Sequence, residues 1–308
     1  MHSIHRTFIT ATVFILVFTL SARGESPEDF IELGIVKGRS GDTSGALDDF
    51  NRALILDPKN SGAYYNRGLV NGQLGNFSAA IADYTSAIKL NPHFPGTYNN
   101  RGFAHAATGN YRAAIIDISK AIALDPLIPE LYNNRGTVKM SLKDYIGAIE
   151  DFTKAARLNP KLAGPFNNRG LAKSLAGNIM GAIEDFTLAL VRDQTYDAAW
   201  YNRGNARLSS GDFNGAIEDY KKALVLQPDL IEAYNNRAFA KASLGDYRGA
   251  VDDMNILIEK GTENAMTYYN RGLAKKMLGD LNGAIADFLK ASNLGDTLSV
   301  SALREMVK

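Results

Sequence analysis

The chain has 308 residues, of which 45% are hydrophobic and 22% charged, which is ordinary globular usage with enough apolar material for a core. Lysine and arginine (34) nearly balance aspartate and glutamate (33), so the net charge does not favour nucleic acid or an anionic membrane surface as a partner. The absence of cysteine excludes disulfides, thiolate nucleophiles and cysteine-based zinc sites.

Residues 1–24 have the layout of a secretory signal peptide. Arg6 precedes an apolar to weakly polar run over residues 8–20, and the small residues Ala22 and Gly24 stand where cleavage would occur. The run is shorter than the ~20 residues that span a bilayer as a helix. We therefore expect an exported protein, periplasmic or secreted. An uncleaved membrane anchor through residues 8–20 is the alternative.

From Pro27 onward the chain repeats with a period of 34 residues, which is typical of a two-helix unit. A single unit of this kind cannot bury its own apolar face, so the stack of units forms the fold. The strongest marker is an arginine at a constant interval: Arg67, Arg101, Arg135, Arg169, Arg203, Arg237 and Arg271. We divide the chain into eight blocks: 27–60, 61–94, 95–128, 129–162, 163–196, 197–230, 231–264 and 265–298.

Each block contains the pattern of two helices joined by a short turn. An aromatic residue at the fourth position begins the first helical pattern, and a glycine followed by Asp or Asn predicts a left-handed turn and the cap of the second helix. In block four Lys143 takes the glycine place, so we expect that turn to adapt. The second helix reads A-I-x-D-aromatic-x-x-A and in most blocks ends before a proline.

Small residues recur at fixed places on both helices. A glycine such as Gly136 stands on the first helix of every block except block seven, which has Ala238, and an alanine such as Ala148 stands on every second helix. Glycine inside a helix costs about 0.5–1 kcal/mol relative to alanine. Its recurrence therefore indicates close approach of the two helices.

These blocks resemble tetratricopeptide repeats over about residues 27–298. Block six shows the motif residues of the family: Trp200, Gly204, Ala216, Tyr220, Ala223 and Pro228. The resemblance implies an all-α fold, a right-handed superhelical α-solenoid of about eight two-helix repeats. The amphipathic pattern of residues 299–308 predicts a short helix that caps the end of the stack. The proline is missing from blocks five, seven and eight, where Gln194, Thr262 and Asp296 stand, and we expect the stack to be least regular near residues 260–262.

The arginine replaces the usual leucine of the family in every block but the first, which has Leu33. An aspartate recurs on the second helices: Asp49, Asp83, Asp117, Asp151, Asp185, Asp219, Asp253 and Asp287. The matched recurrence predicts a structural ladder of partly buried ion pairs. The pairs can form within a block or between neighbours. We favour neighbours, for example Asp117 with Arg135, which would leave Asp287 for Arg304.

An asparagine precedes each of these arginines: Asn66, Asn100, Asn134, Asn168, Asn202, Asn236 and Asn270. Before them stand Tyr65, Asn99, Asn133, Asn167, Tyr201, Asn235 and Tyr269. The resemblance implies that the first helices line a concave surface, where the asparagines hydrogen-bond the backbone of a bound peptide. A carboxamide can both donate and accept. The alternative interpretation is that the asparagines brace neighbouring repeats.

Motifs for enzyme chemistry are lacking in the sequence. No nucleophile motif or phosphate-binding loop is recognisable, and we interpret His105 as a packing residue. We expect no catalytic residue, metal or small-molecule cofactor, and no nucleic-acid partner, since a basic stripe is missing. The expected function is a non-enzymatic scaffold that binds a protein or an extended peptide segment. Two alternatives stay open: a self-assembling structural protein that forms a homo-oligomer, and an accessory adaptor subunit of an envelope enzyme or transport complex.

Overall fold

The computed structural model describes residues 26–261 and 264–306, and this part of the chain contains 17 α-helices and no strand. It divides into two compact units, residues 1–158 and 159–308, of which the first carries α2–α9 and the second α10–α18. The helices are α2 (Pro27–Ser40), α3 (Thr43–Leu56), α4 (Ser61–Gln73), α5 (Phe77–Leu90), α6 (Pro95–Ala107), α7 (Tyr111–Leu124), α8 (Pro129–Ser141), α9 (Tyr145–Leu158), α10 (Ala163–Leu175), α11 (Ile179–Arg192), α12 (Asp197–Ser210), α13 (Phe213–Leu226), α14 (Ile231–Ser243), α15 (Tyr247–Glu259), α16 (Ala265–Met277), α17 (Leu281–Asn293) and α18 (Thr297–Met306).

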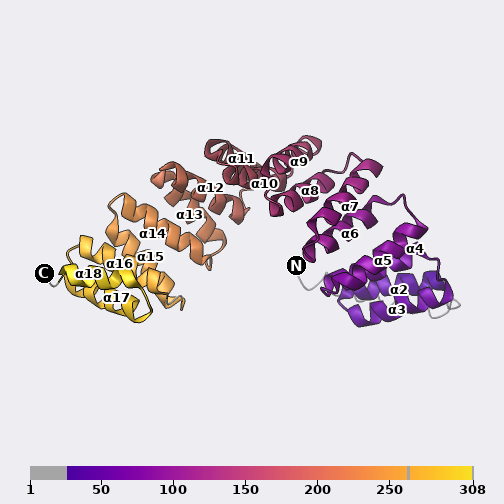
Figure 1. Cartoon of the computed structure of the whole chain (residues 1–308), viewed down its shortest axis with the longest axis horizontal. Helices are drawn as coiled ribbons and strands as arrows, with labels where there is room; N and C mark the ends of the chain where they lie inside the picture. The colour runs from indigo at the N-terminus through magenta and orange to yellow at the C-terminus, as the bar shows by residue number, and fades with distance from the viewer. Residues whose placement is uncertain (1–25, 262–263, 307–308) are drawn as a thin grey trace, which may run out of the picture. The chain divides into compact units, whose positions relative to one another are not determined.

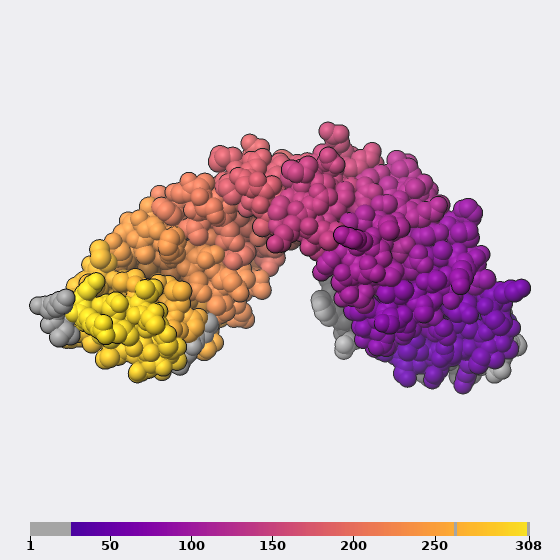
Figure 2. All heavy atoms as spheres, in the orientation of Figure 1, coloured from indigo at the N-terminus to yellow at the C-terminus, as the bar shows by residue number. Residues whose placement is uncertain are grey.

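Each 34-residue block forms one pair of helices, and the pairs follow one another in chain order within each unit (Figure 1). A helix packs against its partner and against the adjoining helices of the next block. Contacts are made between helices that are adjacent in the chain, so the colour changes gradually along each unit in Figure 2. This is the arrangement of an all-α helical repeat solenoid.

The turn between the two helices of a block is left-handed, as the sequence predicts. Gly211, for example, has φ +85°, and Asp212 then accepts a hydrogen bond from the backbone N–H of Gly215 at the start of α13. Two expectations need correction. Lys143 does not change its turn but itself adopts φ +62°, and Asn76 forms no side-chain cap. The first helices also begin three residues before the aromatic residue that marks them.

Close packing explains the glycines of the first helices. A Cβ built on Gly136 would lie 2.8 Å from the ring of Phe152, and one on Gly204 would lie 2.7 Å from the ring of Tyr220. Real side-chain contacts are rarely this short, so the aromatic residue of the second helix occupies the space that the glycine leaves open. The predicted close approach of the two helices is confirmed.

The C-terminal part departs from the regular pattern where the prolines are missing. α15 ends at Glu259 and is followed by the left-handed Gly261 (φ +78°), whereas α3, α5 and α7 each end in an extended residue before proline. Thr262 lies outside the described residues.

The capping helix α18 begins at Thr297, two residues earlier than expected. The Asp296 carboxylate accepts hydrogen bonds from the backbone N–H and the hydroxyl of Ser299, and this contact caps the helix start. Ala302 then packs on Ala284 and Phe288. The expected signal segment, residues 1–24, and residues 307–308 of the expected cap lie outside the described residues. Among the helices described, none combines the length and the apolar character needed to cross a bilayer.

Candidate functional site

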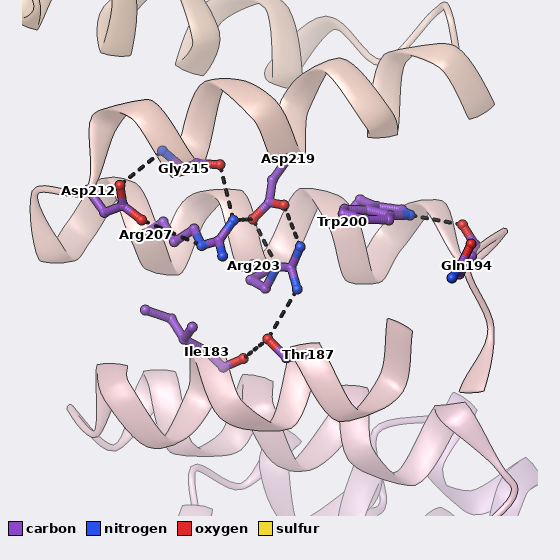
Figure 3. Close-up of polar contacts among 9 residues, drawn as sticks. All are labelled: Ile183, Thr187, Gln194, Trp200, Arg203, Arg207, Asp212, Gly215 and Asp219. Atoms are coloured by element: carbon purple, nitrogen blue, oxygen red, sulfur yellow. Dashed lines mark hydrogen bonds and ion pairs between the residues drawn. The ribbon is translucent and has the colours of Figure 1, made fainter. Parts of the chain in front are cut away.

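Every block from the second to the eighth contains an ion pair between its arginine and the aspartate 16 residues later. In block six, Arg203 donates from Nε and Nη2 to the two carboxylate oxygens of Asp219, at 2.9 and 2.7 Å (Figure 3). The Nη2–Oδ1 distance is 2.5–2.7 Å in all seven pairs, and each aspartate is buried. The predicted ion pairs therefore form.

The favoured pairing between neighbouring blocks is wrong. Asp117 pairs with Arg101 of its own block, and Arg135 pairs with Asp151. Asp287 pairs with Arg271, and is not left for Arg304. The pairing stays within a block because the two helices of a block are joined by a tight turn and lie in direct contact.

A second group binds the same aspartate, and sequence reasoning missed it. Four residues after the arginine, Lys139 places Nζ 2.8 Å from Oδ2 of Asp151. In block one, which lacks the arginine, Lys37 lies 2.6 Å from Asp49. A second 34-residue interval was available as a signal: Lys37, Asn71, His105, Lys139, Lys173, Arg207, Lys241 and Lys275.

His105 holds this second place in block three, so its interpretation as a packing residue needs correction. Its Nε2 lies 3.9 Å from the Asp117 carboxylate, and the ring is only partly buried. In block two Asn71 donates to Asp83 at 3.0 Å instead. His105 thus stands at the register that holds a lysine or an arginine in most of the other blocks.

The third nitrogen of the arginine connects neighbouring repeats. Arg203 Nη1 donates to the hydroxyl of Thr187 in the preceding repeat at 3.1 Å (Figure 3). The same bond is made by Arg67 to Asn51, Arg101 to Thr85, Arg135 to Ser119 and Arg271 to Asn255. The residue at the equivalent place before Arg237 is Lys221 in block six. A lysine side chain has no acceptor atom, so it cannot accept a hydrogen bond from Arg237.

In each Arg–Asp pair of the ladder, the positive and the negative side chain neutralise each other. Each guanidinium also lies over the aromatic ring three residues earlier, as Arg203 does over Trp200 at 4.9 Å. The hydrogen bond to Asp117 raises the pKa of Arg101, although burial opposes that rise. These residues form a scaffold. In the described ranges 26–261 and 264–306, no cluster of His, Asp or Glu is arranged to hold a metal ion.

The asparagine row braces neighbouring repeats. The amide N–H of Asn100 reaches the Tyr65 hydroxyl at 3.2 Å, and that of Asn134 reaches Asn99 at 3.0 Å. In the second unit Asn202 donates to Asn167, and Asn236 donates to Asn205, each across one repeat. Asn66 donates to Gly62 of its own helix. These bonds agree with the alternative interpretation of the row, in which the asparagines brace neighbouring repeats.

The remaining predicted residues lie along the same helices. The rings of Tyr201 and Tyr269 pack on Tyr220 and Phe288. Asn133 and Asn168 are partly buried on α8 and α10. Partner contact by the row stays a prediction.

Three pockets adjoin the row, one in the second unit and two in the first, of which the smallest has about 190 Å³ and includes Asn66 in its lining. The pocket of the second unit has about 620 Å³, and its lining includes Asn235, Asn236, Asn270, Phe239 and Met266. Phe239 is 59% exposed and Met266 is 63% exposed, so this pocket presents two large apolar side chains to solvent.

The larger pocket of the first unit has about 240 Å³ and is lined by Asn100 with the apolar residues Leu69, Phe77 and Phe103. Each unit therefore places asparagine amides beside exposed apolar side chains. Met266 was not among the predicted residues, because it stands one turn before the asparagine row.

Family models match several parts of the chain. A model described as TPR repeat matches residues 39–75 and 204–245, and models described as tetratricopeptide repeat match residues 61–94, 95–126 and 129–162. The chain belongs to the tetratricopeptide repeat family. No significant match to a curated protein sequence was found.

Solved structures share the fold of this tetratricopeptide repeat chain. A crystal structure of MamA superposes with a TM-score of 0.52 at 25% identity and covers 56% of this chain and 94% of its own. One of YrrB, described as a TPR protein with an unusual peptide-binding site, has a TM-score of 0.50 at 22% identity, covering 60% and 95%. A tetratricopeptide repeat protein from Parabacteroides merdae has a TM-score of 0.50 at 19% identity, covering 92% and 100%.

Proposed function

We propose that this chain is a non-enzymatic scaffold that binds an extended peptide segment of a partner protein along its asparagine row. Tetratricopeptide repeat proteins are generally scaffolds of this kind. The observation that carries the proposal is the second-unit pocket, which is lined by Asn235, Asn236 and Asn270 together with the exposed side chains of Phe239 and Met266. Amides suit a peptide backbone, and the apolar side chains suit its residues.

The chemistry of the row favours a neutral segment. An extended peptide presents alternating N–H and C=O groups, which carboxamides can pair with in either direction. The groove places that hold lysine and arginine in carboxylate-clamping members of the family hold Asn and Tyr here. The proposal is supported by the fold that this chain shares with YrrB, which is described as a TPR protein with an unusual peptide-binding site.

Affinity capture tests the proposal. The chain without residues 1–24 is used as bait on an envelope extract of the source cell, beside a Phe239→Ser variant. The matched control is Leu289→Ser, because Leu289 is also an exposed apolar side chain (50%) but lies on a second helix, α17. We chose Phe239 because replacing the asparagines would also remove bonds between repeats.

The expected result is a partner retained by the unchanged chain and by Leu289→Ser but lost by Phe239→Ser. Hydrogen exchange in the complex should then show protection in α14 and α16. Equal capture by all three baits would contradict the proposal. If the partner is an enzyme or transport complex, the scaffold is an accessory adaptor. If it is a second copy, sedimentation of the pure chain should depend on concentration.

We also propose that the protein is exported, on the basis of the signal-like pattern of residues 1–24. Expression of the full chain in the source cell should yield a mature protein that lacks about 24 residues. Its N-terminal residue can be measured by mass spectrometry of the intact protein. A full-length product in the membrane fraction would favour the anchor through residues 8–20 instead.

A further inference from the structure

A separate pocket of about 500 Å³ lies in the second unit and shares no residue with the asparagine row. Its walls come from the second helices α11 and α13, and Trp200 and Arg203 of α12 also line it. Figure 3 shows Thr187 of α11 facing Arg203, with Trp200 beyond them toward Gln194. The proposed peptide-binding role of the row does not use this pocket.

The apolar walls of the pocket depart from the repeat pattern. Val191 is 74% exposed and Val225 is 78% exposed, and the two stand at the same register of consecutive blocks. The other blocks have Ile55, Lys89, Ala123, Arg157, Glu259 and Asn293 at that register. Only blocks five and six place two exposed aliphatic residues in succession. Repeat packing does not account for the pair, since every other block except the first, which has Ile55, packs with a polar or small residue there.

Among the described residues, the Lys222 ammonium at the pocket forms no close ion pair. The pKa of Glu218, one turn earlier on α13, is lowered first by its hydrogen bond to Lys221 and only more weakly by the charge of Lys222. Lys154 and Lys290 stand 22 residues after the aromatic residue of their blocks and lie over its ring, at 5.9 Å from Tyr132 and 5.7 Å from Tyr268. Lys222 holds the equivalent place in block six but does not lie over the ring of Trp200. Within the described residues, no carboxylate is within 4.0 Å of its ammonium group.

The other cation of the pocket is neutralised. Arg203 is held by Asp219 at two points and by Thr187 at a third. Lys222 therefore supplies the positive charge that is available to a ligand. Trp200, Val191 and Val225 supply a concave apolar surface beside it.

We propose that this pocket is a second binding site, which accepts an aromatic or branched aliphatic side chain that adjoins a carboxylate on a peptide segment of a partner protein. The apolar side chain lies between Val191, Val225 and the indole of Trp200. The adjoining carboxylate pairs with the Lys222 ammonium. Charge complementarity selects this ligand over a neutral one.

Trp200 makes the site directly observable, because it is the only tryptophan of the chain. The probe is the peptide acetyl-Glu-Leu-Phe-Glu-amide, and the matched neutral probe is acetyl-Gln-Leu-Phe-Gln-amide. Titration of the chain without residues 1–24 should change the tryptophan emission in a saturable way. We expect the acidic probe to bind about fivefold more tightly, the preference that a partly exposed ion pair supplies.

Two variants test the charged part and the apolar part of the pocket separately. Lys222→Gln should abolish the preference for the acidic probe, and Val225→Asp should weaken binding at least tenfold. Ile55→Asp is the control, because Ile55 is equally exposed (78%) at the same register but lies in the first unit. Circular dichroism checks that each variant keeps its helices.

Three results would overturn the proposal. One is the absence of any saturable change with the acidic probe up to millimolar concentration. Another is a preference for that probe that survives in Lys222→Gln. The third is concentration-dependent association of the unliganded chain that Val225→Asp removes, since the pocket would then be occupied by a second copy.

Discussion

Arg203 and Asp219 are joined by two parallel hydrogen bonds of 2.9 and 2.7 Å, while the same guanidinium donates to Thr187 of the preceding repeat. One side chain thus stabilises the pairing of two helices within a repeat and the stacking of that repeat on its neighbour. Arginine suits this task because its planar guanidinium presents several donors in fixed directions. The recurrence of the arginine follows from this double role.

Block one tests the importance of a single cation. Asp49 is 3% exposed and has no arginine partner, so Lys37 is its ion-pair partner. Lys37→Met should cost about 3 kcal/mol, since a buried charge is then left without compensation. Lys139→Met should cost about 1 kcal/mol, because Asp151 keeps Arg135. Urea unfolding, with hydrogen exchange of α3 and α9 to localise the loss, measures both. Equal losses would contradict the argument.

Lys221 marks a missing bond between blocks six and seven. Lys221→Thr should place a hydroxyl under Arg237, as Thr187 does under Arg203, and raise the stability of the second unit by about 1 kcal/mol. Thermal unfolding measures the gain. Lys221→Ala is the control, because it removes the lysine without adding an acceptor. If both variants change the melting temperature equally, the hydrogen bond is not the cause.

The left-handed conformation of Lys143 should be relieved by glycine. A non-glycine residue at φ +62° carries a steric cost of about 1–2 kcal/mol, partly offset by the greater freedom of glycine in the unfolded chain. Lys143→Gly should therefore raise stability by about 0.5–1 kcal/mol. Gly177→Ala, at φ +85°, is the reverse experiment and should lower it. This explanation requires the denaturation midpoint to rise in Lys143→Gly and to fall in Gly177→Ala.

Gly136 should not tolerate a larger side chain. Gly136→Leu should cost at least about 1–3 kcal/mol, because even a Cβ would lie 2.8 Å from the ring of Phe152. Gly164→Ala is the control, since a Cβ there meets no atom within 4 Å and alanine favours a helix. Its stability should be unchanged or higher. A Gly136→Leu variant with an unchanged melting temperature would refute the packing explanation.

The site was predicted from sequence only in part. The 34-residue interval identified the arginines and aspartates, because residues at one register share one environment in every repeat. It could not choose between Asp117–Arg101 and Asp117–Arg135, since both pairings have the same period. The lysine register was overlooked because two of its members, Asn71 and His105, are not lysines or arginines.

The sequence alone determined the repeat length, the two-helix unit, the turn glycines and the small residues at the crossing, because these depend on local geometry and periodicity. Tertiary structure decided which groups meet. It directed the amides of Asn134 and Asn202 to neighbouring repeats, and within the described residues it left Lys222 without a close ion pair beside Trp200, Val191 and Val225. Such contacts depend on the distance and direction between side chains from different helices, and a register in the sequence does not specify either.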